Sequence, residues 1–227
     1  MRVLHCRKGD EISLFDGHGR TFTGLIDQIE PDGTIIGRIQ PLTPTLSPVR
    51  LDLYQSLIKG AHWDWMIEKG TELGVSSFIP VLTRRAVVSH KSAKEFEGKK
   101  LRSQRLALAS AKQCGRADLP AVRDPMTFEQ ALEDCRKNDG VTLVAWEGLK
   151  AGSGNLGAIL RQALVGLAPG SHPTVHLFIG PEGGFDPEEI ELARKLGALL
   201  FGLGPLILRA ETAAIVSCAL IQHELSR

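Results

Sequence analysis

Two loops near the end of this chain have the sequences Gly180-Pro181-Glu182-Gly183-Gly184-Phe185 and Leu203-Gly204-Pro205-Leu206-Ile207-Leu208-Arg209-Ala210-Glu211-Thr212. Each loop follows an apolar run that predicts a buried strand, at 175–179 and 198–201, and each precedes a helix-like segment. Open α/β sheets bind small molecules at the carboxyl ends of their strands. The loops therefore predict a crevice at the ends of neighbouring strands, where backbone N–H groups face a ligand.

The first loop combines glycines with a helix start. Gly180, Gly183 and Gly184 permit positive φ and let a ligand approach the backbone closely. Asp186 is predicted to cap the next helix and Glu189 to complete a capping box, with Pro187 at the first helical position. An ordinary tight turn between strand and helix is the alternative, but three glycines exceed what a turn needs, which favours a ligand loop.

The second loop carries two charges, Arg209 and Glu211, within an apolar stretch. Charges in such surroundings are costly unless they are paired or functional. One interpretation is a functional pair, and the other is a structural ion pair at a helix start, where the helix dipole favours Glu211. Both interpretations stay open at the level of the sequence.

The remainder of the chain predicts two domains. Residues 11–39 read as short strands with glycine-rich turns, which suggests a small β-barrel, and a linker rich in proline and threonine is predicted from Pro41 to Pro48. From residue 49 onward strand-like and helix-like segments alternate, which predicts an α/β domain with a mostly parallel sheet. The predicted domains are 1–46 and 47–227.

A dinucleotide-binding pattern provides one alternative function. Gly152-Ser153-Gly154-Asn155-Leu156-Gly157 fits GxGxxG, the fingerprint of NAD-dependent oxidoreductases. Its context fits poorly, because five residues separate the strand end at Trp146 from the first glycine, and the next strand ends in Gly-Pro instead of an acidic residue.

The composition is ordinary for a soluble globular protein, with 43% hydrophobic residues and a net charge of +1. No apolar run reaches the length of a membrane span, and no signal peptide opens the chain, so a cytoplasmic protein without a membrane partner is expected. The four cysteines lack paired spacing, which predicts reduced thiols and no metal site. The seven histidines are scattered and read as surface or core residues.

The charge is unevenly distributed. Residues 84–116 contain ten basic and two acidic residues, a local net charge of +8 in a nearly neutral chain. We call residues 84–116 the basic segment. A concentration of this kind is typical of a polyanion partner such as RNA, and a solvated helix face is the alternative. Four candidate RNA-binding residues lie at its ends: Arg84, Arg85, Lys112 and Arg116.

Several of these motifs together resemble one family. Phe178-Ile-Gly-Pro-Glu-Gly-Gly-Phe185 and Leu203-Gly-Pro-x-Ile-Leu-Arg-x-Glu-Thr-Ala213 resemble the bacterial 16S ribosomal RNA (uracil-N3) methyltransferases of the SPOUT superfamily. Leu14-Phe-Asp-Gly17, Thr71-Glu-Leu-Gly74 and Gln113-Cys-Gly-Arg116 match as well. The resemblance covers nearly the whole chain.

The resemblance implies an N-terminal PUA-like β-barrel that helps to hold ribosomal RNA. It also implies a C-terminal α/β domain with a trefoil knot, which binds S-adenosylmethionine and forms a homodimer. By resemblance, Arg209 and Glu211 face the methyl-transfer site. The implied cofactor-binding residues are Gly180, Glu182, Gly183, Leu203, Gly204, Ile207 and Leu208.

Two departures from the family stand out. The family usually has arginine where this chain has Leu206, which weakens the expectation of an RNA contact there. Family members also have a further strand before the segment that matches Arg2-Val3-Leu4, so the barrel here is predicted without its first strand. The leading hypothesis is a methyltransferase of uracil N3. The alternatives are an RNA-binding protein of the same fold with weakened catalysis and an NAD-dependent oxidoreductase.

Overall fold

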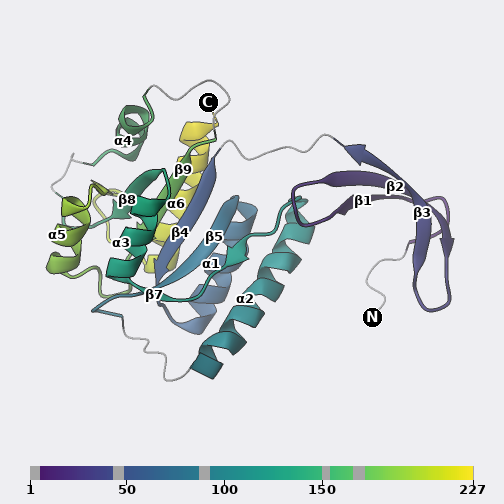
Figure 1. Cartoon of the computed structure of the whole chain (residues 1–227), viewed down its shortest axis with the longest axis horizontal. Coiled ribbons are helices and arrows are strands. Elements are labelled where there is room, and N and C mark those ends of the chain that lie inside the picture. The colour runs from purple at the N-terminus through teal and green to yellow at the C-terminus, as the bar shows by residue number, and fades with distance from the viewer. Residues whose placement is uncertain (1–5, 43–48, 87–92, 150–153, 166–171, 227) are drawn as a thin grey trace. The chain divides into compact units, whose positions relative to one another are not determined.

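The computed structural model describes residues 6–42, 49–86, 93–149, 154–165 and 172–226 (Figure 1). The chain divides into two compact units. The first unit comprises Met1–Leu46 with Ala111–Leu119, and the second comprises Ser47–Ser110 with Pro120–Arg227. Within the described ranges, no helix is both long and apolar enough to cross a membrane.

The first unit contains an antiparallel sheet with the order β1-β2-β3, which confirms the predicted hairpins. The strands are β1 (Glu11–Phe15), β2 (Thr21–Ile29) and β3 (Ile35–Leu42). Asp16 shapes the first turn, since its Oδ1 accepts from the N–H of His18 at 2.8 Å. Over residues 6–42 the sheet is open, with β1 and β3 at its two edges.

The prediction that the linker begins at Pro41 is wrong, because β3 continues to Leu42 and Pro41 lies opposite Phe22. Proline cannot donate to a strand ladder, but β3 is an edge strand of the described sheet, where a missing donor is tolerated. The other predicted linker residues, 43–48, lie outside the described residues.

The second unit contains a seven-stranded parallel sheet with the order β10-β8-β9-β4-β5-β6, and β7 also pairs with β5. This confirms the predicted α/β class with a parallel sheet. The strands are β4 (Arg50–Ser56), β5 (Val75–Leu82), β6 (Ala121–Val122), β7 (Met126–Thr127), β8 (Val141–Ala145), β9 (Thr174–Ile179) and β10 (Leu199–Phe201). The prediction that the two glycine-bearing loops follow neighbouring strands is wrong, because β8 lies between β9 and β10.

Helices cover both faces of this sheet (Figure 1). The helices are α1 (Gly60–Glu72), α2 (Ala93–Cys114), α3 (Phe128–Lys137), α4 (Leu156–Ala163), α5 (Pro187–Lys195) and α6 (Ala210–Leu225). One apolar core joins the sheet to α1, α4 and α6, and a second core joins it to α3 and α5. The nearly continuous apolar strands are explained by this burial on two sides.

The predicted start of α5 is confirmed, because Asp186 and Glu189 form a capping box there. Thr127 and Gln130 form another capping box at α3. Asn155 caps α4 by accepting from the N–H of Ala158 at 2.9 Å. These local signals fix where each helix begins, and hence where the preceding loop must end.

A buried polar pair in the sheet predicts a pH-dependent stability. His176 is buried, its Nδ1 lies 3.8 Å from Oδ2 of Asp52, and burial lowers the pKa of His176. Below about pH 6.5 the unfolded chain protonates this histidine while the folded chain keeps it neutral, so acidification favours unfolding. We expect the free energy of unfolding to fall by up to about 1.4 kcal/mol per pH unit there from this group.

The measurement is urea unfolding of wild type and His176→Gln at several values between about pH 5 and pH 7. The variant is expected to show a flatter dependence of the unfolding free energy on pH. Equal slopes for the two proteins would assign the acid sensitivity to other groups.

Candidate functional site

A pocket of about 980 Å³ lies at the carboxyl ends of β4, β8, β9 and β10, and we call it the strand-end pocket. Its volume lies in the upper part of the range of small-molecule sites. The following residues line it: Lys59, His62, Ala145–Glu147, Leu149, Gly154, Asn155, Ile179–Glu182, Gly184, Gly202–Glu211 and Ala213. Both glycine-bearing loops thus reach one pocket, and the end of β8 forms a wall between them.

The Gly180 loop forms one wall of the pocket. The N–H of Gly184 donates to the carbonyl of Pro181 at 2.9 Å, and Gly184 has a φ of +69°. This positive φ favours glycine, and a Cβ at Gly184 would also displace the carboxylate of Glu147. The expectation of positive φ holds for Gly184 only, since neither Gly180 nor Gly183 has a positive φ.

Gly183 differs from the other predicted cofactor residues. A Cβ on it would lie 3.3 Å from the backbone oxygen of Arg85, and Gly183 is absent from the pocket lining. The remaining six predicted cofactor residues do line the pocket: Gly180, Glu182, Leu203, Gly204, Ile207 and Leu208. The close approach at Gly183 is therefore between two stretches of this chain.

The end of β4 holds the Gly180 loop in place. Gln55 is fully buried, and its Nε2 donates to the carbonyls of Ser56 at 3.0 Å and Gly180 at 3.4 Å. The N–H of Lys59 donates to Oε1 of Glu182 at 3.5 Å. Gln55 is not among the predicted site residues, although a polar residue inside an apolar strand is a signal that can be searched for.

The Gly204 loop forms the opposite wall. The N–H of Gly202 donates to the carbonyl of Gly154 at 3.1 Å, which ties this loop to the start of α4. Gly204 has a φ of +113°, and a Cβ on it would meet nothing within 4 Å. Leu206 and Ile207 line the pocket yet expose 77% and 86% of their surface. The loop therefore offers apolar surface and open space to a ligand.

The GxGxxG segment contributes to the same pocket. Gly154 and Asn155 line it, whereas Gly152 and Ser153 lie outside the described residues. Gly154 has a φ of +77° and precedes the cap of α4. Its carbonyl accepts from Gly202, so its observed role is to support the Gly204 loop.

Glu211, which is buried, and His62, which is half-buried, form a polar pair in the pocket. Oε1 of Glu211 lies 2.9 Å from Nδ1 of His62, and the side chain of Glu211 is only 7% exposed. Glu211 lies in the first turn of α6, where the helix dipole favours a negative charge. Arg209 lines the pocket, is exposed, and forms no ion pair within the described part of the chain. The partner of Glu211 is thus His62, and an Arg209–Glu211 ion pair is not formed.

His62 is a functional candidate, whereas the sequence predicted a surface or core histidine. It lies in the first turn of α1, directly after the carboxyl end of β4. Its place beyond a predicted strand end is the signal that could have identified it.

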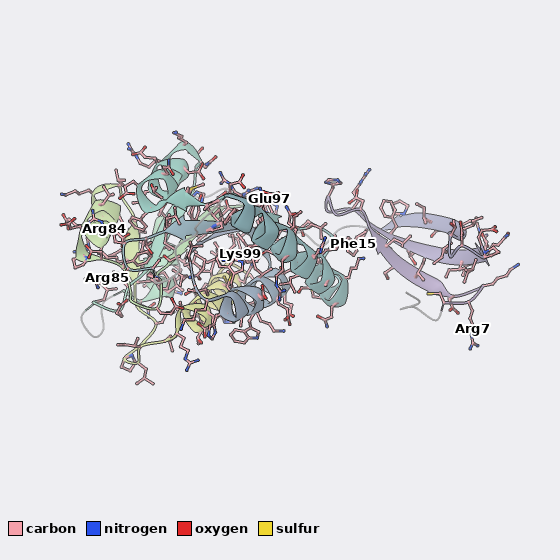
Figure 2. The ribbon with its side chains drawn as sticks, turned by 90° about the horizontal axis from the view of Figure 1, so that it is seen from below. Arg7, Phe15, Arg84, Arg85, Glu97 and Lys99 are labelled. Atoms are coloured by element: carbon pink, nitrogen blue, oxygen red, sulfur yellow. The ribbon has the colours of Figure 1, made fainter. Side chains whose placement is uncertain are left out.

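The candidate RNA-binding residues lie outside the strand-end pocket. Arg84 forms an ion pair with Glu188, and Nη2 of Arg85 lies 3.3 Å from Oδ2 of Asp186, so both arginines contact the start of α5 (Figure 2). In the first unit, Nη2 of Arg116 lies 2.7 Å from Oδ2 of Asp118, while Lys112 is exposed in the last turn of α2.

Acidic residues from outside the basic segment therefore offset part of its charge. Besides the pairs above, Nζ of Lys100 lies 2.7 Å from Asp124, and Nη2 of Arg102 lies 2.6 Å from Asp64. The local charge of +8 counted along the chain overstates the charge of the folded surface.

Among the described residues, no group of three or more His, Cys, Asp or Glu side chains could hold a metal ion.

The chain is similar to known RNA methyltransferases over most of its length. The model of the RNA methyltransferase domain family matches residues 45–222. The ribosomal RNA small subunit methyltransferase E of Bacillus subtilis is 34% identical over 78% of this chain and 67% of its own length. The protein of the same name from Synechocystis is 34% identical over 97% of this chain and 68% of its own length.

Solved structures show the same similarity in three dimensions. The ribosomal RNA small subunit methyltransferase E of Neisseria gonorrhoeae, bound to S-adenosylmethionine, superposes with a TM-score of 0.78 at 27% identity, covering 98% of this chain and 86% of its own. A putative methyltransferase from Legionella pneumophila, also with bound S-adenosylmethionine, gives a TM-score of 0.76 at 29% identity, covering 97% of this chain and 86% of its own.

Proposed function

Because this chain belongs to the RNA methyltransferase domain family, we propose that it transfers a methyl group from S-adenosylmethionine to small-subunit (16S) ribosomal RNA. The observation that carries this proposal is the strand-end pocket, which brings both family motifs together with a buried carboxylate at its centre. The similarity to two chains solved with S-adenosylmethionine supports the cofactor. NAD chemistry has no comparable support.

The residues present fit S-adenosylmethionine. Leu203, Ile207 and Leu208 offer apolar contacts, and the open space beside Gly204 admits a ligand close to the backbone. Gly180 and Glu182 complete the proposed cofactor site on the opposite wall. When bound, this cofactor supplies an activated methyl group, so transfer requires alignment of donor and acceptor and needs no metal.

We propose N3 of uracil as the acceptor atom. N3 carries a proton near neutral pH, so removal of that proton must be assisted. The Glu211–His62 pair is the proposed acceptor, since both side chains line the pocket, Glu211 is buried there and the two contact each other. Arg209 lines the same pocket and would stabilise the negative charge that develops on the uracil ring or hold a neighbouring phosphate.

The function is tested with two measurements on the full chain. Calorimetry with S-adenosylmethionine and with NAD identifies the cofactor. Incubation with methyl-labelled S-adenosylmethionine and 16S ribosomal RNA, followed by mass spectrometry of nucleosides, identifies the product as 3-methyluridine. Binding of both ligands without methylation would favour the alternative of an RNA-binding protein with weakened catalysis.

We also propose the finer architecture that the family resemblance implies: a trefoil knot of the SPOUT type in the second unit, a PUA-like barrel in the first, and a homodimer acting in the cytoplasm. α6 supports the dimer, because it is apolar around most of its circumference and Leu220 is 41% exposed. Sedimentation of the full chain at micromolar concentration tests the homodimer.

The basic segment yields a prediction about RNA binding. We expect Lys112→Ala to weaken RNA binding and to lower the salt-dependence slope by about 0.7 to 0.9 of a unit, since each phosphate contact releases that share of a counterion and its loss removes that release. Arg116→Ala, Arg84→Ala and Arg85→Ala are expected to have smaller effects, because those arginines already pair with carboxylates. The measurement is RNA affinity across a salt series, with Lys137→Ala as a control outside the segment. If the salt-dependence slope of Lys112→Ala equals that of wild type, this lysine contacts no phosphate and lies on a solvated helix face.

A further inference from the structure

A second pocket of about 360 Å³ lies between the first turn of α1 and α2 in the second unit, and we call it the α1–α2 pocket. Its walls are apolar and aromatic, formed by Leu57, Ile58, Pro80, Val122, Trp63 and Phe96. Nε1 of Trp63 donates to Oγ of the buried Ser103 at 3.0 Å, which fixes the indole. The volume falls within the roughly 300–1,000 Å³ of small-molecule sites.

Cations surround this apolar pocket. Lys99, Lys100 and Arg102 contribute to its lining from α2, and Figure 2 shows Lys99 on that helix. Asp64 is the one carboxylate of the lining and pairs with Arg102 at 2.6 Å, while Lys100 pairs with Asp124 at 2.7 Å. An apolar and aromatic floor beside these ion pairs suits a planar, uncharged ring attached to an anion, which can take the place of the carboxylates.

The two pockets share one turn of helix. Lys59 and His62 line the strand-end pocket, whereas Gly60, Ala61 and Trp63 line the α1–α2 pocket. Because a helix with its side chains is only about 10–12 Å across, ligands on two sides of this turn would lie about that far apart. A chain of nucleotides can therefore reach from one pocket into the other.

We propose that the α1–α2 pocket binds an unstacked nucleobase of the RNA strand that presents the target nucleotide, and that its rim cations hold the phosphate of that nucleotide. The inference rests on the proposed function, since it assigns a second contact of the same substrate. Single-stranded RNA is recognised in this way, by stacking of splayed bases on aromatic side chains and by cations along the backbone. Phosphate alone would not need the apolar walls.

Two variants test the pocket on the full chain. Trp63→Leu removes the stacking surface, and Ala61→Phe fills the pocket from an exposed position on α1. Both are expected to weaken binding of a single-stranded 16S ribosomal RNA fragment roughly tenfold, with unchanged affinity for S-adenosylmethionine. Trp65→Leu is the matched control, because Trp65 lies on the same helix, is 45% exposed and does not line the pocket.

Trp63 also packs against the core, so the stability of Trp63→Leu is checked by urea unfolding. If that variant is destabilised, the RNA affinity of Ala61→Phe alone is the test. Cross-linking of 4-thiouridine-substituted RNA, read by mass spectrometry of peptides, gives a direct readout. Cross-links to Trp63 or Phe96 support the proposal. Cross-links confined to the loops of the strand-end pocket, or wild-type RNA affinity in Ala61→Phe, overturn it.

Two further outcomes separate this inference from others. If Ala61→Phe weakens binding to the assembled small subunit but not to naked RNA, the pocket binds a ribosomal protein and the nucleobase assignment is overturned. If the wild-type chain binds S-adenosylmethionine but methylates no ribosomal RNA, the proposed function fails. The nucleobase site is then still tested by the quenching of tryptophan fluorescence with uridine monophosphate in wild type and in Ala61→Phe. Equal quenching in the two proteins overturns the nucleobase site. Loss of quenching in Ala61→Phe supports it.

Discussion

Glu211→Gln should lower the single-turnover rate of ribosomal RNA methylation by about 100-fold or more, the usual contribution of a general acid or base. Glutamine keeps the shape of the buried side chain and its contact with His62 but cannot accept a proton. The affinity for S-adenosylmethionine should stay unchanged, because the loss arises in the transition state. His62→Gln should lower the same rate, if the two side chains act as a unit.

Arg209→Ala is expected to lower the same rate by roughly 100- to 1,000-fold, as when a donor to a developing anion is removed. Glu191→Gln serves as the control, because Glu191 is exposed on α5 and lies outside the pocket. The measurement is a single-turnover assay with saturating RNA and cofactor. Normal rates in Glu211→Gln and Arg209→Ala would remove both residues from the catalytic list.

Gly204→Val is expected to abolish detectable binding of S-adenosylmethionine. Its Cβ would enter open space beside the pocket, and the φ of +113° is one that side chains rarely adopt. The control is Gly197→Val, because Gly197 has a φ of +88°, has nothing within 4 Å of its Cβ position and lies outside the pocket. Both variants place valine at a positive φ, so a difference in cofactor affinity reports a change at the pocket and not a general effect of backbone strain. Calorimetry of both proteins gives the result.

Gly183→Val separates the sequence expectation from the structure. By the resemblance, Gly183 belongs to the cofactor loop, but its Cβ would press on Arg85 instead of entering the pocket. We therefore expect a weaker loss of cofactor affinity than for Gly204→Val. An equal loss would indicate that the cofactor itself lies against Gly183.

Local structure and the general location of the site could be predicted from the sequence. Strands, helices and the capping boxes at Thr127 and Asp186 follow from short-range periodicity and side-chain hydrogen bonds, which are encoded within a few residues. The two glycine-bearing loops could be placed at strand ends for the same reason. Pro41 was predicted to lie in a linker because proline is excluded from inner strands, but an edge strand tolerates it. The sequence of one strand does not reveal whether that strand lies at the edge of its sheet.

Which segments meet could not be predicted from the sequence and depends on the tertiary fold. The position of β8 between β9 and β10, the pairing of His62 with Glu211, and the ion pairs that offset the basic segment all join residues far apart in the chain. Many strand orders and side-chain pairings satisfy the same local pattern. The one that forms is set by how the two apolar faces of the sheet are covered and by which buried charges find partners, and both depend on the whole fold.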